Sequence, residues 1–453
     1  MKKNYLLGMA LMASLSFYSC DKEVVYVQDG NGVESVTDGA QIITLQVENG
    51  GDGLATRAGR PLYSAEAKQT IENVKLWICD NTGKVVYVKE ISKWNDNKVS
   101  TVYTTGGHGR QTTIELKDAD KLAAGTYKIY AVGYSSNSDY TLDAVTSVAK
   151  EGTFKENMVL PIKDGAANKI GEEIFAGQIM ELTVTEGKGF KEPIVLNRQV
   201  AGAFAYVKDI PYMEGAKYLK LVASAQNESL VLGHFNSFDL TGNGSGNDVN
   251  VKYVVNGTNG KSGSETYVIS TIDLNEWFTT IKDEDGDNLI DAGENWKNPR
   301  RPSDSPAAGT YPTFQKGSAF GGEFVIPFAH VDGKQTLTLQ LTNEGGTVLR
   351  SWKVNLGSAD EQLKQTITCW NSESTDWSTS LSGESSNTYS LVRNHLYGIG
   401  TRMNDEVDPE QPGVDPDPDP EDPDDKPESL NNKQELVLKV NDNWEVIHGM
   451  ELD

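Results

Sequence analysis

One short segment carries the residue types that bind a hard metal cation. The sequence DEDGDNLIDAGE at residues 283–294 spaces its oxygen-bearing groups as the calcium loop of an EF-hand does. Carboxylates this close together repel one another unless a cation offsets their charge. We therefore predict a Ca²⁺ site with a structural rather than a switching role. Its expected ligands are Asp283, Asp285, Asp287, the Leu289 carbonyl, Asp291 and Glu294.

The loop departs from the EF-hand pattern at one backbone position. Asn288 stands where Gly is usual, and Asn tolerates the left-handed conformation that this position requires. Pro299 and Pro302 follow too soon for a second helix. The segment is thus expected to be a calcium loop without the flanking helices, and the alternative is an acidic surface loop.

No residue pattern supports catalysis. The five histidines are scattered, and they form neither an HExxH motif nor a paired metal-ligand spacing. The stretch GTNGKSGS resembles a phosphate-binding loop, but Val255 occupies the place of the first glycine that the motif requires. We expect a polar loop between strands there, and we predict that the protein is not an enzyme.

The first twenty residues predict export. Lys2 and Lys3 precede a short apolar stretch that ends in SFYSC, which is typical of a signal peptide and too short for an anchor helix. Small residues before Cys20 resemble a lipobox, in which Cys20 is lipidated and becomes the new N-terminus. A plain signal peptide with an incidental cysteine is the alternative. Cys79 and Cys369 lack a CxxC motif and are expected to be small apolar residues; their pairing stays open.

The net charge of −24 is unevenly distributed. Between Asn404 and Leu430, 12 acidic residues stand against one Lys, so −11 of the charge lies in this segment. A chain this acidic is unsuited to nucleic acid and to direct docking on an anionic membrane surface. The repeated Asp-Pro pairs predict an extended, semi-rigid spacer.

The elements that must position these residues are strands. IITLQV alternates apolar and polar residues, and VKLWICDNTGKVVYVKEI has two apolar runs around a turn at residues 80–83, which predicts a hairpin. Strands of this kind recur between Gly, Asn and Asp turns, which is typical of β-sandwiches. Helix is confined to short pieces such as SAEAKQTIENV. A chain of 453 residues has room for two domains, with a soft boundary near Pro211.

Several stretches in order along the chain resemble the fimbrillins of Bacteroidetes bacteria, the subunits of protease-assembled (type V) fimbriae. They are SFYSC, VKLWICDNTGKVV, AAGTYKIYAVG, EEIFAG, LNRQVAGAFAYVKDIP and SLVRNHLYGIG. The C-terminal LVLKVNDNWEVIHGMELD is similar to the tail of the minor-fimbria shaft pilin group.

The resemblance implies an all-β pilin with two tandem sandwiches of transthyretin-like, Greek-key type. It implies export as an outer-membrane lipoprotein precursor, removal of the first strand by an Arg-specific trypsin-like protease, and filling of the vacated groove by the C-terminal strand of a neighbouring subunit. The implied partners are identical or related fimbrial subunits and the anchor and tip subunits. The implied segments are a signal peptide (1–20), a propeptide (21–57), two sandwiches (58–211 and 212–403), an acidic linker (404–430) and a donor strand (431–453).

Both ends of the chain fit this scheme residue by residue. GGDGLATRAGRP after the first strand is a Gly-rich loop of the kind that proteases cut. Arg60 precedes Pro61, so Arg57–Ala58 is the better bond. The donor-strand residues that we expect to enter the groove are Leu436, Leu438, Val440, Trp444, Val446, Met450 and Leu452. Two other functions stay open: a tip or accessory adhesin, and a surface glycan-binding β-sandwich lipoprotein.

Overall fold

The computed structural model describes residues 26–28, 34–36, 39–48, 71–103, 109–163, 173–233, 254–258, 261–291, 296–297, 314–328, 337–356, 366–381, 391–400, 427–431 and 433–443. In this part of the chain the structure is almost entirely strand, which confirms the all-β prediction. The helices described are the 3₁₀ turn η1 (Asp118–Asp120), α1 (Asp143–Thr146) and α2 (Leu274–Trp277). None of the described helices has the length and apolar character needed to cross a membrane.

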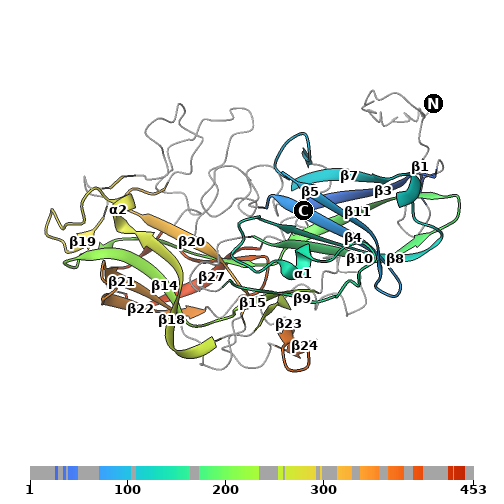
Figure 1. The fold of residues 1–453 in the computed structure, drawn as a ribbon. Coiled ribbons are helices and arrows are strands. Elements are labelled where there is room, and N and C mark those ends of the chain that lie inside the picture. Colours follow the sequence, from blue (N-terminus) through green and yellow to red (C-terminus); the bar gives the residue numbers. More distant parts are fainter. Residues whose placement is uncertain are drawn as a thin grey trace, which may run out of the picture.

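The first group of strands forms a hydrogen-bonded path in the order β5-β4-β8-β10-β11-β3-β7-β6, and β1 and β2 extend it beside β11. The bounds are β1 (Tyr26–Gln28), β2 (Glu34–Val36), β3 (Gln41–Glu48), β4 (Asn73–Asp80), β5 (Val85–Ser92), β6 (Thr101–Tyr103), β7 (Gly109–Leu116), β8 (Gly125–Tyr134), β10 (Phe175–Val184) and β11 (Gly189–Arg198). The pairing of β10 with β11 is short and covers only Phe175 and Ala176 of β10. The path folds over itself at this point, and Figure 1 shows the resulting layers in blue and green.

A hydrophobic core fills the space between these layers. Ile43, Leu45 and Val47 of β3 are buried in the same cluster as Leu76 and Ile78 of β4. Alternate residues of β4 enter a second cluster on the opposite face, so this strand is buried on both sides. The predicted hairpin is confirmed, because β4 and β5 pair antiparallel around Gly83, whose φ is +84°.

The second group follows the order β18-β14-β21-β22-β27-β25-β12-β20, with β26 beside β12. The bounds are β12 (Ala201–Lys208), β14 (Ala216–Gln226), β18 (Lys261–Asp273), β20 (Ala319–Val325), β21 (Leu337–Asn343), β22 (Val348–Leu356), β25 (His395–Ile399), β26 (Glu428–Ser429) and β27 (Glu435–Asn443). Its core includes Phe204 and Tyr206 of β12, Leu219 of β14 and Trp352 of β22. Sheet membership changes between Arg198 and Ala201, whereas the boundary predicted near Pro211 falls in a short later strand and stays a prediction.

Smaller sheets contain the remaining described strands, and one of them joins the two groups. The sheet β17-β15-β9 contains β9 (Met158–Pro161), β15 (Ser229–Leu232) and β17 (Gly257–Thr258). The sheet β16-β23-β24 contains β16 (Val254–Val255), β23 (Thr366–Asn371) and β24 (Asp376–Leu381), and β13 (Ile210–Pro211) pairs with β19 (Leu289–Ile290). Because β9 lies between β8 and β10 of the first group in sequence and pairs with β15 of the second half, the halves share main-chain hydrogen bonds.

Candidate functional site

The strand β3, which the sequence predicts as the strand that leaves, lies in the interior of the first sheet. It runs parallel to β11 over Phe190–Leu196 and antiparallel to β7 over Gly109–Leu116. Neither edge of β3 is therefore free to solvent. Removing such a strand would leave the facing N–H and C=O groups of both neighbours without partners, and that cost persists until another strand takes its place.

The side chains of β3 alternate between the core and the outer surface. Gln41, Ile43, Leu45 and Val47 are buried, and the residues between them are only partly buried. The three apolar side chains are fully enclosed, so each contributes on the order of 1.5–3 kcal/mol of burial relative to exposure. A strand that replaced β3 would need apolar side chains at the same alternate positions.

Gln41 is a functional candidate that the sequence reasoning missed. Its Nε2 atom donates to the Leu122 carbonyl at 2.9 Å, and its Oε1 atom accepts from the Leu122 N–H at 2.7 Å. Only 4% of the Gln41 side chain is exposed. The amide thus holds the chain between η1 and β8 against the start of β3. A polar residue at the head of an alternating apolar run is the signal that would have pointed to it.

The C-terminal strand does not extend away from its own subunit in this structure. β27 pairs parallel with β22 through Lys353–Leu356 and antiparallel with β25 through His395–Gly398. Leu436 is 1% exposed and belongs to the core of the second group. The tail therefore completes a sheet of its own chain in this state. Residues 441–443 continue the strand past an irregularity in its register.

Several predicted residues lie outside the described part of the chain. They are Cys20, Arg57, Ala58, Glu294, Trp444, Val446, Met450 and Leu452. Leu438 and Val440 belong to β27, but their side chains also lie outside the described part. Lipidation and cleavage at the first three positions thus stay predictions. The described cysteines Cys79 and Cys369 are not joined in a disulfide; Cys79 is buried, and burial raises the pKa of its thiol to about 12.

The acidic loop brings its first three expected ligands together. The carboxylates of Asp283, Asp285 and Asp287 place one oxygen each within 4.8 Å of one another. Asn288 has a φ of +65°, the left-handed conformation expected at that position. The Asp283 carboxylate also accepts hydrogen bonds from the N–H groups of Gly286 (2.8 Å) and Asn288 (3.1 Å). The loop is therefore curled around its carboxylates, and an oxygen-rich cluster of this size fits a Ca²⁺ ion.

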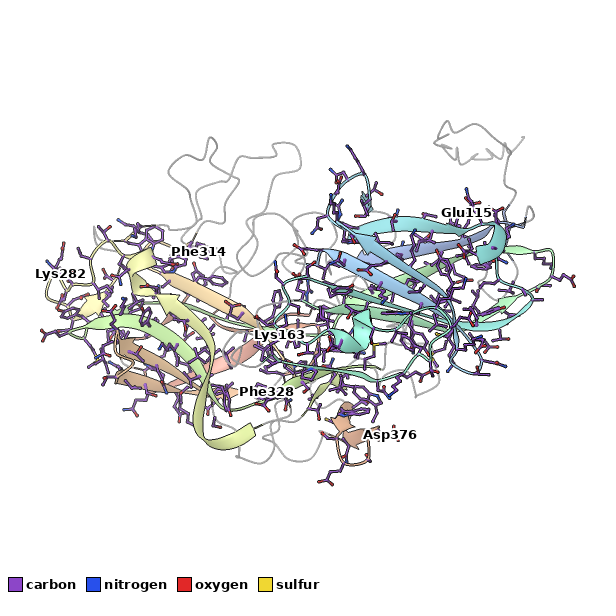
Figure 2. All side chains as sticks on the ribbon, in the orientation of Figure 1. Glu115, Lys163, Lys282, Phe314, Phe328 and Asp376 are labelled. Atoms are coloured by element: carbon purple, nitrogen blue, oxygen red, sulfur yellow. The ribbon has the colours of Figure 1, made fainter. Side chains whose placement is uncertain are left out.

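Charge repulsion affects the pKa of one aspartate in the same loop. The Leu289 N–H, which Asp287 accepts at 2.8 Å, lowers the pKa of Asp287. Desolvation and the neighbouring Asp285, Asp291 and Asp283 carboxylates outweigh this hydrogen bond, and the pKa is raised overall. Figure 2 places the loop, marked by Lys282, at the end of the molecule far from Glu115 of β7. The acidic loop and β3 are thus separate sites.

Comparison with known proteins gives matches at the level of structure. No protein-family model matches the chain, and no curated protein does. The tip fimbrial protein Mfa3 from Porphyromonas gingivalis, with C-terminal truncation, is 11% identical, with coverage of 80% of this chain and 94% of that one and a TM-score of 0.37. The fimbrial anchor protein Mfa2 from the same organism is also 11% identical, with 78% and 98% covered and a TM-score of 0.31.

A fimbrial assembly protein from Parabacteroides distasonis is 12% identical, with 75% of this chain and 98% of that chain covered and a TM-score of 0.32. The solved structures that match this chain include Bacteroidetes fimbrial proteins. Because identities and TM-scores are this low, function is inferred below from the chain's own strands.

Proposed function

We propose that this protein is a structural subunit of a cell-surface fimbria that polymerises by donor-strand exchange. An Arg-specific trypsin-like protease cuts after Arg57, and the cut removes the propeptide together with the lipid on Cys20. The single observation that supports this best is the position of β3, an interior strand whose chain connection to β4 runs through the segment with Arg57. One cut in that segment separates β3 from every later strand.

The tail strand is suited to the vacated place by its direction. In its own sheet β27 lies between a parallel neighbour, β22, and an antiparallel neighbour, β25. β3 likewise lies between parallel β11 and antiparallel β7. A tail from a second subunit would therefore form the same pattern of slanted and perpendicular hydrogen bonds that it forms in its own subunit.

The two places differ in the length of pairing that they offer. β3 pairs with β11 over Gln41–Val47, whereas β27 pairs with β22 only over Glu435–Leu438. A longer pairing adds main-chain hydrogen bonds and buried side chains, so the exchange gains free energy in the acceptor relative to the tail's own sheet. The acidic spacer that precedes β27 in the sequence has the reach to carry the strand to another molecule.

The matched test uses two neighbouring arginines. The purified precursor is treated with an Arg-specific protease, and polymers are followed by size-exclusion chromatography and electron microscopy. The Arg57→Ala variant should stay monomeric, whereas Arg60→Ala, whose arginine precedes Pro61, should be cut and polymerise. Polymers of uncut Arg57→Ala would contradict the proposal.

A second arm tests the direction of exchange. An uncut Arg57→Ala subunit keeps β3, so it has a tail to donate but no vacant place to accept one. Added to processed subunits, it should shorten the polymers in proportion to its amount, because each copy ends one chain. A chain that carries this change and also lacks residues 431–453 should not shorten them. Equal polymer lengths in both mixtures would contradict donor-strand exchange.

We also propose that the acidic loop binds Ca²⁺ as a structural ion. Asp283, Asp285, Asp287, the Leu289 carbonyl and Asp291 would hold it, with Glu294 as the remaining expected ligand. The curled loop and the raised pKa of Asp287 support this assignment. The ion would offset the repulsion among the carboxylates and stabilise the end of the second group of strands.

A further inference from the structure

β3, which the proposed cut removes, and β27 of the tail carry similar residues at the same alternate positions. Residues 41–47 read QIITLQV and residues 434–440 read QELVLKV. The four buried positions of β3 carry Gln, Ile, Leu and Val in that order. The same alternate positions of the tail carry Gln, Leu, Leu and Val. Alternation alone explains the apolar residues of both strands, but it does not explain a glutamine at the head of each.

The side chain of Gln41 in β3 binds the backbone of a distant segment. Its amide makes two hydrogen bonds to one residue, Leu122, which is 81 positions away in the chain. When β3 is gone, the N–H and C=O of Leu122 lose both partners. A partly buried amide group without partners costs about 1–3 kcal/mol. The vacated place is thus selective for an incoming side chain that both donates and accepts at this point.

We propose that Gln434 sets the register of the incoming tail by taking the place of Gln41. The inference rests on the proposed donor-strand exchange and specifies it. Leu436, Leu438 and Val440 then occupy the positions of Ile43, Leu45 and Val47. The Gln434 amide donates to the Leu122 carbonyl of the neighbouring subunit and accepts from its N–H, as Gln41 does before cleavage.

Other registers are disfavoured by the residues on the tail itself. A slip of one residue turns Glu435 and Lys439 toward the apolar core, because successive residues of a strand face opposite sides. A slip of two residues in one direction buries the Gln434 amide at the position of Ile43. A slip of two in the other direction places Leu436 opposite Leu122 and leaves both backbone groups without partners.

The same glutamine favours exchange over the tail's own sheet. In its own subunit Gln434 is exposed, and its backbone carbonyl accepts from the Lys353 N–H at 3.1 Å. Its side chain therefore gains a buried, doubly hydrogen-bonded site only in the neighbouring subunit. A group with different interaction free energies in two states biases the equilibrium between them.

Cross-linking measures the register directly. Gln111 of β7 lies opposite Gln46 of β3, and the proposed register puts Lys439 in that position. Facing residues of antiparallel strands have Cα atoms about 4.5–5.5 Å apart, within the range that a disulfide spans. The processed chain with Gln111→Cys and Lys439→Cys should form a ladder on a non-reducing gel. The chain with Gln111→Cys and Val437→Cys, which reports a slip of two residues, should not.

The rate of assembly tests the proposed role of Gln434. Gln434→Ala should slow polymerisation of the processed chain by about tenfold, the equivalent of one to two lost hydrogen bonds. Asn431→Ala, at an exposed position three residues earlier, is the matched control and should assemble at the parental rate. Because Gln434 is exposed in the monomer, its replacement should leave the melting curve of the precursor unchanged.

The outcomes distinguish failure of the proposed register from failure of the proposed function. A ladder with the Val437 pair, or an unchanged rate for Gln434→Ala, overturns the register while the polymers themselves still support exchange. If the parental processed chain forms no polymers, both proposals fail. Cross-linking of the uncut double-cysteine precursor would also contradict the inference, because β3 then still occupies the place opposite Gln111.

Discussion

Glu173 and Arg198 form a buried ion pair at the point where the chain leaves the first group of strands. The Arg198 Nε atom donates to Glu173 Oε1 at 2.7 Å, and its Nη2 atom lies 2.6 Å from the same oxygen. The Arg198 Nη1 atom also donates to Asn394 Oδ1 at 3.3 Å, in the segment that leads into β25. The pair therefore ties the end of β11 to a strand of the second group.

Breaking this pair on one side should destabilise the protein. Glu173→Gln keeps the shape of the side chain but leaves the guanidinium buried without its counter-charge, at a cost of about 3–5 kcal/mol. Urea unfolding followed by tryptophan fluorescence should show a large fall in the midpoint. Glu151→Gln removes the charge from an ion pair with Lys84 that is exposed, so this control should leave the midpoint almost unchanged. Equal midpoints for both variants would contradict this prediction.

Glu323 of β20 should make the stability depend on pH. Burial, and then the nearby Asp139 carboxylate, raise its pKa to about 7 from the ordinary 4.5. Between these two values the folded state binds a proton that the unfolded state has lost, so stability falls as pH rises from about 4.5 to 7. After allowance for remaining solvent exposure, the effect is on the order of 1–2 kcal/mol.

The measurement is the unfolding free energy of Glu323→Gln at pH 5 and pH 8. The variant should lose the part of the slope that Glu323 contributes and should be more stable than the parent at pH 8. Glu181→Gln, at an exposed position of β10, should keep the parental slope. A parental slope in the Glu323 variant would show that this carboxyl is ionised throughout the range.

Local patterns predicted the strands and turns well because both depend on neighbouring residues. The alternation in residues 42–47 predicted β3, and the Gly83 turn predicted the hairpin of β4 and β5. The curl of the acidic loop followed in the same way from its Asp spacing and from Asn288. The predicted helix over SAEAKQTIENV was wrong at its end, since Asn73 and Val74 belong to β4 and pack in the sheet.

Long-range pairing could not be predicted in the same way. Nothing in the sequence of β27 indicates that it lies between β22 and β25, because a strand carries no local mark of its neighbours. The contact of Gln41 with Leu122 is equally remote, and the change of sheet after Arg198 depends on packing rather than on a turn signal. The fold class was therefore accessible from sequence, whereas the present place of the tail was not.

Substitutions of two buried leucines should affect the stability of the precursor and of the polymer differently. Leu45 of β3 and Leu436 of β27 are 0% and 1% exposed, so Leu→Ala at either position should cost the precursor about 2–5 kcal/mol. In the proposed exchange, cleavage removes Leu45 with the propeptide, whereas Leu436 enters the neighbouring subunit. Polymers of Leu45→Ala should thus resist heat and detergent as the parent does, and polymers of Leu436→Ala should dissociate more readily. Equal resistance of the two polymers would contradict the assigned place of Leu436.

Calcium should stabilise the second group of strands through the acidic loop. β19, which directly follows Asn288, pairs with β13, so an ordered loop also fixes this short sheet. Millimolar Ca²⁺ should raise the thermal midpoint by a few degrees, and a chelator should reverse the rise, because binding to the folded state alone stabilises it. Asp285→Asn should abolish the response, and Asp376→Asn, at the exposed start of β24, should keep it. The raised pKa of Asp287 adds a second check: as pH falls through it, protons compete for the carboxylate, so the midpoint shift should shrink earlier than for an ordinary Asp. A midpoint that is insensitive to Ca²⁺ at neutral pH would identify the segment as an acidic surface turn.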